Sequence, residues 1–517
     1  MKSSTLQLIG FLIASSLVAS MGCTKESDPT KALYWIQRLD DAEHQSEALQ
    51  QLGRMKAKEA IPELIKRFEA NEELRAPIAT TLGQIGDKSV VPTLIKGLNF
   101  QVGAGSDRRS RTLNQANSKI VEALGMLEAK EGVEPIIQML GSLNPYVRKD
   151  ACRALGDIGD PRAVPELSRV ADHDENMNIR RTAVESLGDI GDPGAIPSLL
   201  RAMFIEQGAS LYPFASFAMF QIGPPAVEPL LQVLRGQHAE INRLADQLNF
   251  QDGALQIKAI EVLGDLRPEG IENELIAMFR KYDRMKDEDF PLRMLMLRNI
   301  AMALEKVGGD AAGNLLADSL LQHEDFTVRE FYALAINHIG NRAVLPRLLR
   351  AAQTGDSDAR RVVLRAYTQL GTGEDLAALE KFGETVKAPR PEIVDAVQRI
   401  IEREKVRLEA HAECKQDKDC WERKLSDDNR RIREKAAYEL GRLGAKDKVD
   451  ALIKATADQD EDARRAAIWA MFQLRVPKGI DFMENTLRNE RGRPDYIRIN
   501  EELKRLVVFL GRQPASA

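Results

Sequence analysis

The residue types that could perform catalysis are scattered along this chain. It holds six histidines, at positions 44, 173, 238, 323, 338 and 411. Only His323 is followed directly by a glutamate, Glu324, and a two-metal catalytic centre needs more ligands than one such His-Glu pair. The sequence also lacks a phosphate-binding glycine loop, a nucleophile elbow and a metalloprotease helix. It therefore predicts no catalytic residues, no metal, no cofactor and no small-molecule substrate.

Two of the four cysteines lie close enough in the sequence to act together. Cys414 and Cys420 are predicted to form a disulfide in an oxidising compartment. A loop this short would add about 2 kcal/mol of stability. The alternative is a zinc site with His411 and Asp417, which lacks a regular four-ligand spacing. Cys152 lies in an apolar helical pattern and is predicted to be a buried thiol.

The first thirty residues resemble an export signal. Lys2 precedes the mostly apolar stretch 6–18, and small residues lead to Cys23. The pattern is similar to a bacterial lipoprotein signal, although Ser20 stands where leucine is usual. The resemblance implies a signal peptide over 1–22, a lipid on Cys23 and a polar tether over 23–30.

The same resemblance implies a place in the bacterial cell envelope, facing the periplasm. The residue after the cysteine is Thr24 and not aspartate, which favours the outer membrane. Two or three acyl chains would anchor the protein firmly. The alternatives are ordinary secretion and a soluble protein with an apolar start.

Length and composition describe a folded, helix-rich chain. Its 517 residues exceed what one compact core holds, and 44% of them are hydrophobic while only 5% are aromatic. There are 73 basic and 78 acidic residues, for a net charge of −5. This balance argues against a nucleic-acid partner.

One phrase recurs along the chain. Residues 151–165 and 183–197 share the pattern Leu-Gly-Asp-Ile-Gly-Asp-Pro, and prolines 135, 165, 197 and 229 are 30 or 32 residues apart. Gly159 and Gly191 would end a helix in the left-handed conformation, and the Asp-Pro that follows would begin the next helix. We predict helical hairpins that must stack to bury their apolar faces, which makes an all-α solenoid.

These repeats resemble the HEAT family, in the variant shared with the phycobilin lyases, over about 31–385 and 421–511. In that family an arginine near the start of the second helix pairs with an acid in a turn. Here the arginines are Arg148, Arg180, Arg329, Arg360, Arg433 and Arg464, and the acids are Asp172, Asp325, Asp356, Asp427 and Asp458. Such repeats serve many tasks, so the resemblance implies the fold and not the function.

Three repeats carry an enlarged turn between their two helices. These turns lie near residues 99–111, 235–252 and 281–290. Stacked repeats would place such turns on one rim, where insertions often bind partners. The candidate binding residues are Phe100, Arg108, Arg109, Arg111, Phe250 and Tyr282. The alternative is tolerated loop decoration.

A concentration of aromatic residues marks the unit around 204–220. Most of them have the spacing of a helical core. Tyr212 and Phe214 flank Pro213 and are further candidates for contact with a partner.

The predicted domains are a main solenoid over 31–388, a joint over 389–420 and C-terminal repeats over 421–517. The joint should contain one helix from Glu392 to about Glu413 and then the two cysteines. We predict a lipid-anchored, non-enzymatic scaffold that binds envelope proteins through its concave face and the rim of enlarged turns. The alternative is a lyase, an isomerase or a metal-dependent enzyme that uses the groove.

Overall fold

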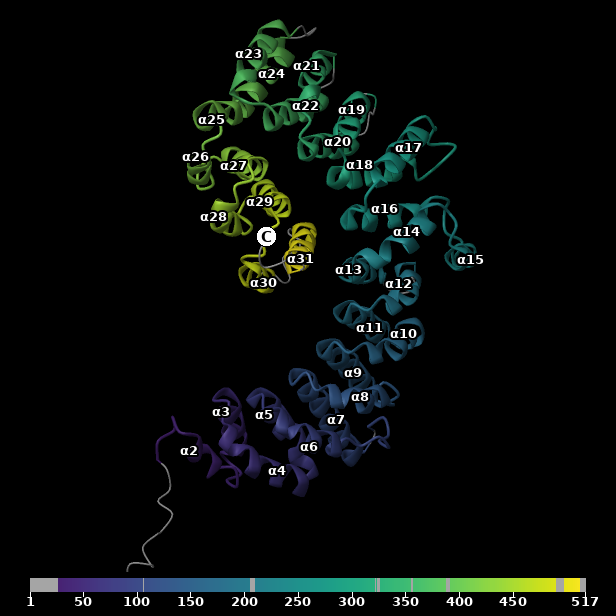
Figure 1. Cartoon of the computed structure of the whole chain (residues 1–517), viewed down its shortest axis with the longest axis vertical. Coiled ribbons are helices and arrows are strands. Elements are labelled where there is room, and N and C mark those ends of the chain that lie inside the picture. Colours follow the sequence, from purple (N-terminus) through teal and green to yellow (C-terminus); the bar gives the residue numbers. More distant parts are fainter. Residues whose placement is uncertain are drawn as a thin grey trace, which may run out of the picture. The chain divides into compact units, whose positions relative to one another are not determined.

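The computed structural model describes residues 27–511, except 106, 205–209, 321, 323–325, 355–356, 387–390 and 490–496. Every regular element in these described ranges is a helix (Figure 1). None of the helices searched is both long enough and apolar enough to cross a membrane. The predicted signal peptide and Cys23 lie outside the described residues.

The helices form two compact units, divided between Ala218 and Met219. Unit 1 contains α2 (Ala32–Ile36), α3 (Gln45–Arg54), α4 (Ile61–Ala70), α5 (Arg75–Ile85), α6 (Val91–Gly97), α7 (Arg108–Met126), α8 (Val133–Met139), α9 (Pro145–Ile158), α10 (Val164–His173), α11 (Met177–Ile190) and α12 (Ile196–Met203). Helix α13 (Tyr212–Ile222) spans the boundary.

Unit 2 continues the array and ends with the C-terminal repeats. It contains α14 (Val227–Leu234), α15 (Ala239–Leu248), α16 (Ala254–Leu266), α17 (Ile271–Asp283), α18 (Arg293–Val307), α19 (Asp310–Ser319), α20 (Phe326–Ile339), α21 (Leu345–Thr354), α22 (Ser357–Leu370), α23 (Leu376–Thr385), α24 (Pro391–Glu404), α25 (Val406–Cys414), α26 (Lys418–Lys424), α27 (Arg430–Arg442), α28 (Val449–Ala455), α29 (Glu461–Leu474), α30 (Ile480–Asn489) and α31 (Ile497–Gly511).

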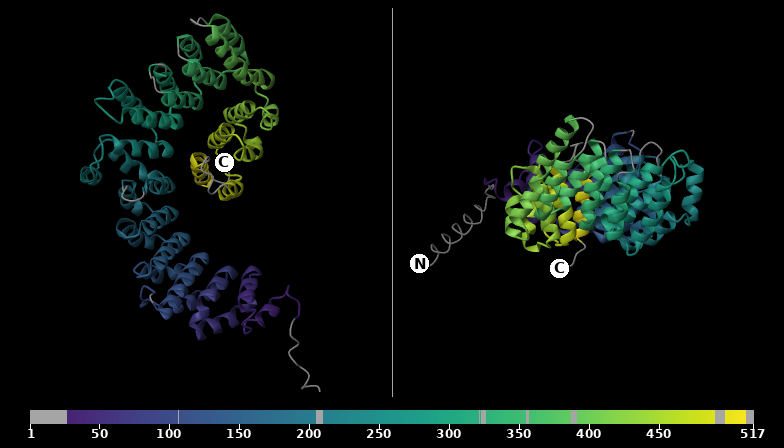
Figure 2. Two further views of the ribbon diagram at one scale, coloured as in Figure 1. Left: turned by 180° about the vertical axis from the view of Figure 1, so that it is seen from behind. Right: turned by 90° about the horizontal axis from the view of Figure 1, so that it is seen from above.

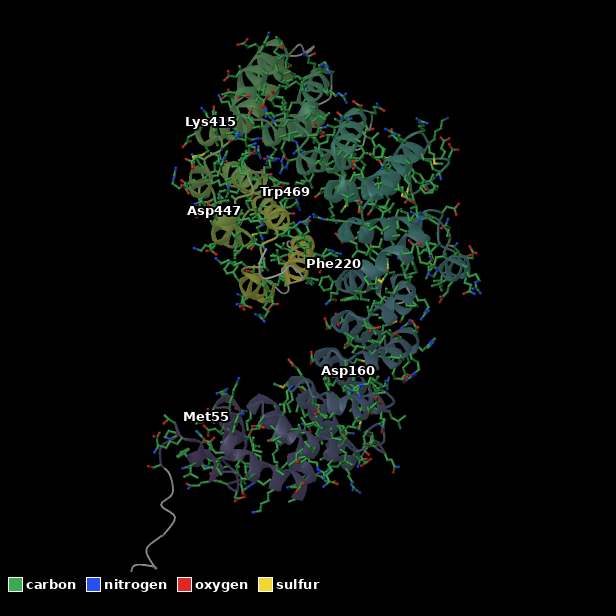
Figure 3. The ribbon with its side chains drawn as sticks, viewed as in Figure 1. Met55, Asp160, Phe220, Lys415, Asp447 and Trp469 are labelled. Atoms are coloured by element: carbon green, nitrogen blue, oxygen red, sulfur yellow. A yellow bond between two sulfur atoms is a disulfide. The ribbon has the colours of Figure 1, made fainter. Side chains whose placement is uncertain are left out.

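The recurring phrase forms the turn between consecutive repeats, as the sequence predicts. Gly159 ends α9 in the left-handed conformation with φ of 69°. The side chain of Asp160, labelled in Figure 3, then accepts a hydrogen bond from the backbone N–H of Arg162. A short 3₁₀ turn over Pro161–Ala163 leads into α10. Asp192 repeats this arrangement one unit later, so the phrase fixes the same sharp corner in each repeat.

The second helix of each hairpin packs against its counterparts in the neighbouring repeats, and we call these the inner helices. Their closest approach in unit 1 is at a glycine. A Cβ atom on Gly156 would lie 2.9 Å from the side chain of Ser186, and one on Gly125 would lie 3.0 Å from Ala154. This glycine sets how closely the inner helices stack.

Ion pairs also join neighbouring repeats, although not always with the predicted acid. Arg148 binds both carboxylate oxygens of Asp174, at 2.8 and 3.2 Å. Arg433 binds Asp458 in the same two-pronged way. The expected Asp172 instead accepts from Arg201 at 2.6 Å, because Asp172 is still on α10 and faces the next outer helix. Asp325 and Asp356 lie outside the described residues.

The C-terminal helices of unit 2 lie on the inner side of the arc formed by α16, α18, α20 and α22 (Figures 1 and 2). Arg505 of α31 binds Asp265 of α16 at 2.6 Å, and Arg442 of α27 binds Asn337 of α20 at 2.8 Å. The division into units therefore differs from the predicted domains. Residues 219–388, the joint and the C-terminal repeats form one compact unit because the chain folds back on itself.

The predicted continuous helix from Glu392 to Glu413 is wrong, because the structure breaks it into α24 and α25 at Lys405. Glu404 is buried at the break and accepts hydrogen bonds from Arg407 and Arg431. The turn brings this buried ion network to the start of α27.

We predict that Gly156→Ala destabilises the protein by roughly 1–3 kcal/mol, although alanine is the better helix former. The added Cβ would meet the backbone of Ser186 at 3.0 Å and force α9 and α11 apart. Urea unfolding and hydrogen exchange of α9 and α11 measure the effect. Gly159→Asn is the matched control: its Cβ meets nothing within 4 Å, and asparagine tolerates the left-handed conformation. Equal effects of the two substitutions would contradict this account.

Candidate functional site

The first enlarged turn, between α6 and α7, is held in place by asparagine side chains. Asn117 accepts a hydrogen bond from the N–H of Asn99 at 2.9 Å and donates to its carbonyl at 2.7 Å. Asn114 and Asn144 donate to two further carbonyls of the turn, at 2.8 and 3.3 Å. These bonds give the loop a preformed surface.

Large apolar side chains are exposed on and beside this loop. Tyr146 is 75% exposed, Leu143 is 67% exposed and Phe100 is 50% exposed. Leu143 and Tyr146 flank Asn144, which is bonded to the loop. We use the name turn patch for these three residues together with the exposed arginines Arg108, Arg109 and Arg111. The sequence predicts four of its six members.

The electrostatics of the turn patch favour an anionic partner. Arg108 and Arg109 begin α7, whose first turn has no acidic residue after the Asp107 cap. The positive end of a helix disfavours cations, so their placement costs local stability. Arg108 pairs with Glu73 at 3.0 Å and Arg109 with Glu72 at 3.5 Å. These pairs are exposed and contribute little, which leaves the arginines able to exchange partners.

The other predicted binding residues belong to other repeats than the turn patch. Phe214 is half-buried beneath the guanidinium of Arg181, 5.3 Å from the ring centre, and Tyr212 is also half-buried. Phe250 of unit 2 is half-buried beneath Lys258, and the second enlarged turn contains helix α15. In contrast to Phe100, none of these three side chains is fully exposed.

Tyr282, which the sequence also predicts to bind a partner, is only 7% exposed. Its ring packs on Phe290, 4.9 Å away between centroids. Burial raises the pKa of its hydroxyl, and Asp252 raises it further. The third enlarged turn folds over Tyr282 because Phe290 at its far end supplies an apolar contact.

Within unit 2, a chain of polar contacts joins the inner helices to the C-terminal helices. His338 of α20 lies between Glu305 of α18 and the hydroxyl of Tyr438 of α27, 2.6 Å from each. Its ring also stacks on Trp469, labelled in Figure 3, with centroids 5.7 Å apart. These contacts attach α27 and α29 to the concave side of the arc.

A buried lysine on α27 strengthens this attachment. Lys435 is fully buried and donates to the carbonyls of Gln369 and Gly371, at 2.7 and 2.8 Å. It pairs with Glu439 at 2.8 Å. Burial lowers the pKa of Lys435 to about 8, and Glu439 offsets part of that effect. Glu439 is also bound by Arg442 at 2.8 Å.

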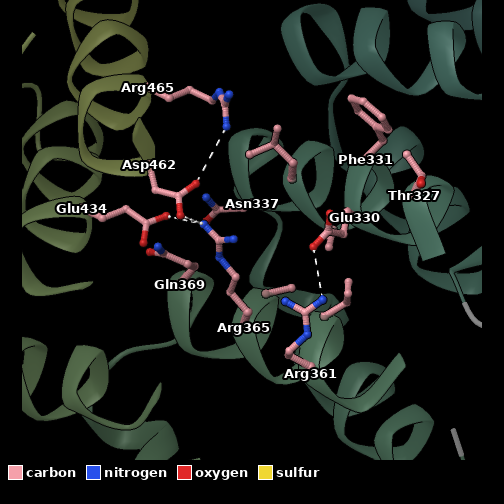
Figure 4. A pocket seen from close by; sticks show the side chains of 14 residues that line it. Thr327, Glu330, Phe331, Asn337, Arg361, Arg365, Gln369, Glu434, Asp462 and Arg465 are labelled. Carbon is pink, nitrogen blue, oxygen red and sulfur yellow. Dashed lines mark hydrogen bonds and ion pairs between the residues drawn. The ribbon is translucent and has the colours of Figure 1, made fainter. Parts of the chain in front are cut away.

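A pocket of about 330 Å³ lies where the C-terminal helices meet α20 and α22 (Figure 4). One wall is apolar and is formed by Phe331, Leu334 and Val362, together with two alanines. The rest of the lining is polar, with Gln369 from α22 and acidic and basic residues from four helices, α20, α22, α27 and α29.

The charges that line this pocket are paired with one another. Arg365 of α22 binds Asp462 at 2.8 Å and Glu434 at 3.1 Å. Burial opposes the charge on Arg365, but these two carboxylates together raise its pKa. Arg465 lies 3.8 Å from Asp462, and Arg361 lies 3.6 Å from Glu330. Three acids thus balance three arginines, and the lining has no net charge.

Cys414 and Cys420 are joined by a disulfide, with their Cα atoms 5.3 Å apart. Among the described residues, one group of three possible metal ligands lies close together, and it consists of Glu413 and these two cysteines. The alternative zinc site would also use His411, whose Nδ1 accepts from the N–H of Gly373. Disulfide sulfurs are not thiolate ligands, so this arrangement fits a covalent link at the joint. Cys152 is buried, and burial raises the pKa of its thiol to about 12.

Sequence reasoning missed Leu143, Tyr146 and Gln369, although a comparison of repeats could find them. In the next repeat, the positions of Leu143 and Tyr146 around the helix cap are Glu175 and Asn178. Exposed apolar residues at positions that are polar in another repeat indicate an interaction surface.

The comparison with protein families gives a match over more than half of the chain. The family model described as HEAT repeats matches residues 31–104, 118–205, 314–391 and 421–499. No curated protein matches the chain.

The chain is similar to several solved structures. The complex of CpcE and CpcF of phycocyanin lyase from Nostoc sp. PCC7120 is 24% identical, over 44% of this chain and 88% of that chain, with a TM-score of 0.27. Importin beta is 14% identical over 93% and 74%, with a TM-score of 0.38. The Kap95:Nup1 complex is 14% identical over 92% and 70%, with a TM-score of 0.48.

We predict a pH dependence from Glu439, whose side chain is almost fully buried. Burial alone would raise its pKa, but Lys435 and Arg442 outweigh it and lower the pKa to about 2. A lowered pKa stabilises the fold above the ordinary value near 4.5, and this stability is lost as the pH falls toward 2. Glu439→Gln should therefore be less stable than the wild type by roughly 3 kcal/mol at pH 7, and this gap should shrink below about pH 4.5.

Urea unfolding followed by tryptophan fluorescence between pH 7 and pH 3.5 measures the gap. Leu440→Ala is the control, because it removes buried apolar contacts from the same helix without removing a titrating group. Its gap to the wild type should stay constant with pH. A constant gap for Glu439→Gln would show that the ion network does not stabilise the attachment.

Proposed function

The chain belongs to the HEAT-repeat family, and from this premise we propose that it is a non-enzymatic scaffold that binds other proteins. Stacked helical repeats expose an extended surface whose corners can vary while the core stays the same. The turn patch of unit 1 carries the proposal. Tyr146 and Leu143 expose most of their apolar surface beside the enlarged loop, to which Asn144 between them donates a hydrogen bond.

The turn patch suits a partner segment with an apolar anchor and acidic neighbours. Tyrosine and arginine are frequent among residues that dominate binding energy. Because the loop is already ordered, little conformational entropy is lost when a partner docks. Acidic residues of the partner would replace Glu73 and Glu72 as the ion-pair partners of Arg108 and Arg109.

We include the concave face of unit 1 as a second contact surface. Asp157 and Asp189 are exposed near the ends of successive inner helices, and Met126 is exposed on α7. Partial burial raises the pKa of Asp157, and repulsion from Asp189 raises it further. A partner with basic residues would relieve that repulsion.

We also propose that the scaffold is lipid-anchored at Cys23 and faces the periplasm, with the outer membrane favoured. The signal-like sequence before Cys23 motivates this proposal. The disulfide between Cys414 and Cys420 supports it, because such bonds persist in oxidising compartments.

We expect Tyr146→Ser combined with Leu143→Ser to weaken partner binding at least tenfold, since buried anchor residues each contribute about 1–2 kcal/mol or more. A photo-crosslinking residue at Phe100 captures the partner in native membranes. Titration of the purified partner onto wild-type and variant protein then gives the Kd. Arg111→Ala should lower affinity mainly at low salt.

Leu33→Ser is the matched control, because Leu33 is an exposed leucine of unit 1 on a different repeat. Met126→Ser tests the concave face in the same assay. The turn-patch proposal fails if the double variant and Leu33→Ser bind the partner equally well.

For the anchor, Cys23→Ala should abolish incorporation of labelled palmitate and release the protein from membranes. Cys152→Ala should leave both unchanged, because Cys152 is buried in the folded repeat. Density-gradient fractionation of the wild-type protein distinguishes the two membranes. Labelling that persists in Cys23→Ala would exclude this anchor.

A further inference from the structure

The penultimate residue of an inner helix occupies an equivalent place in several repeats. In unit 1 this position holds Asp157 in α9 and Asp189 in α11, both exposed. In unit 2 it holds Asp265, Lys306, His338 and Gln369, at the ends of α16, α18, α20 and α22. The C-terminal helices lie against this row in unit 2, so each member needs a partner there.

Three members of the row have strong partners. Asp265 binds both Lys306 and Arg505. His338 binds Glu305 and Tyr438. The position is thus used to attach the C-terminal helices.

The fourth member, Gln369, breaks this pattern. Its side chain is 2% exposed, and neither the amide nitrogen nor the amide oxygen has a hydrogen-bond partner. A buried amide without partners costs folding free energy, so native proteins rarely keep one. Gln369 lines the 330 Å³ pocket, as the close view shows (Figure 4).

The rest of the lining restricts what can occupy the pocket. The arginines and acids are paired, so the pocket does not select an ion by net charge. Phe331, Leu334 and Val362 offer an apolar wall. Thr327 and the partly exposed Glu330 and Arg361 lie at the mouth, which leaves a route from solvent. A volume of this size is at the lower end of the range for ligand pockets.

We propose that this pocket binds a short uncharged peptide segment of a partner protein, with a peptide group on Gln369 and an apolar side chain against Phe331. The inference rests on the proposed scaffold function and adds a site in unit 2 to it. A peptide group offers one donor and one acceptor, which complement the two free groups of the Gln369 amide. The terminal torsion of glutamine is broad, so the amide can turn toward the ligand.

The test compares Gln369→Leu with the wild type, using two probes: N-acetyl-leucine N-methylamide and a capped Ala-Leu-Gly-Ala tetrapeptide. Saturation-transfer NMR on the full chain reports binding. Gln369→Leu should bind both probes at least tenfold more weakly. The same substitution should raise the Tm by roughly 2 °C, because it removes the unpartnered amide.

Gln398→Leu is the control for stability. Gln398 belongs to the same unit, but its amide donates to the carbonyl of Gly383 at 2.6 Å, so this substitution should lower the Tm and leave probe binding unchanged. A Gln369→Leu protein that loses stability, or that binds both probes as tightly as the wild type, would overturn the proposal.

The probes also separate the alternatives. The tetrapeptide should bind at least tenfold more tightly than the single capped residue; equal affinities would assign the pocket to a free small amide and overturn the peptide assignment. N-acetyl-leucine carries a carboxylate. If it binds more tightly than the two uncharged probes, the pocket is an anion site, and the peptide assignment is overturned as well. Crosslinking through Phe100 is read in parallel. If the probes bind but Phe100 captures no partner, only the turn-patch proposal is contradicted. If Phe100 captures a partner but the probes do not bind, only the pocket proposal is contradicted.

Discussion

Contact between inner helices at a glycine sets the geometry of the stack in unit 1. Gly125 and Gly156 let the backbone of the next inner helix approach so closely that a single added carbon would collide with it. Helices held at such short range can slide very little, because their side chains interlock on both sides. The repeats therefore stay in register, and the corners that follow the recurring glycine and aspartate stay in line. A loop such as that around Phe100 can then be enlarged without disturbing the core, since it grows outward from a fixed edge.

The same register has a different consequence in unit 2. There the ends of the inner helices meet the C-terminal repeats and not solvent, so each polar residue at that position loses water. Asp265 and His338 regain hydrogen bonds from residues 240 and 100 positions away in the sequence. Buried ion pairs add little net stability, because desolvation offsets most of their attraction. The hydrogen bonds within these pairs are directional, however. If α27 or α31 docked differently, several charges would be buried without a partner. These networks therefore favour one arrangement of the C-terminal repeats over other apolar packings.

The local repeat could be predicted from the sequence because its causes are local. Gly159, Asp160 and the apolar spacing of α11 determine a helix end, a cap and a buried face within a few residues of one another. The return of the C-terminal helices could not be predicted, since Arg505 and Asp265 look like ordinary surface charges until they meet. Tyr282 shows the converse limit. A tyrosine in a charged loop suggests exposure, and only the position of Phe290 shows that it is covered. Of the predicted binding residues, Phe100 and its neighbouring arginines are on an exposed surface because the asparagines around them are close in sequence and fix the loop.

Departures from the repeat carry more information about function than the repeat itself, and they differ in kind. Leu143 and Tyr146 put apolar groups where the next repeat is polar, which costs solubility but little stability, because exposed side chains contribute little to the core. Gln369 instead leaves a buried amide unpaired, which costs stability directly. Its neighbours in the same row show that the array can supply a partner at this position, through an arginine for Asp265 and a tyrosine for His338. A chain that satisfies the other three members of this row in unit 2 has an unpaired amide at the fourth, beside a pocket with an apolar wall and no net charge. A ligand that supplies the missing hydrogen bonds accounts for this exception in physical terms.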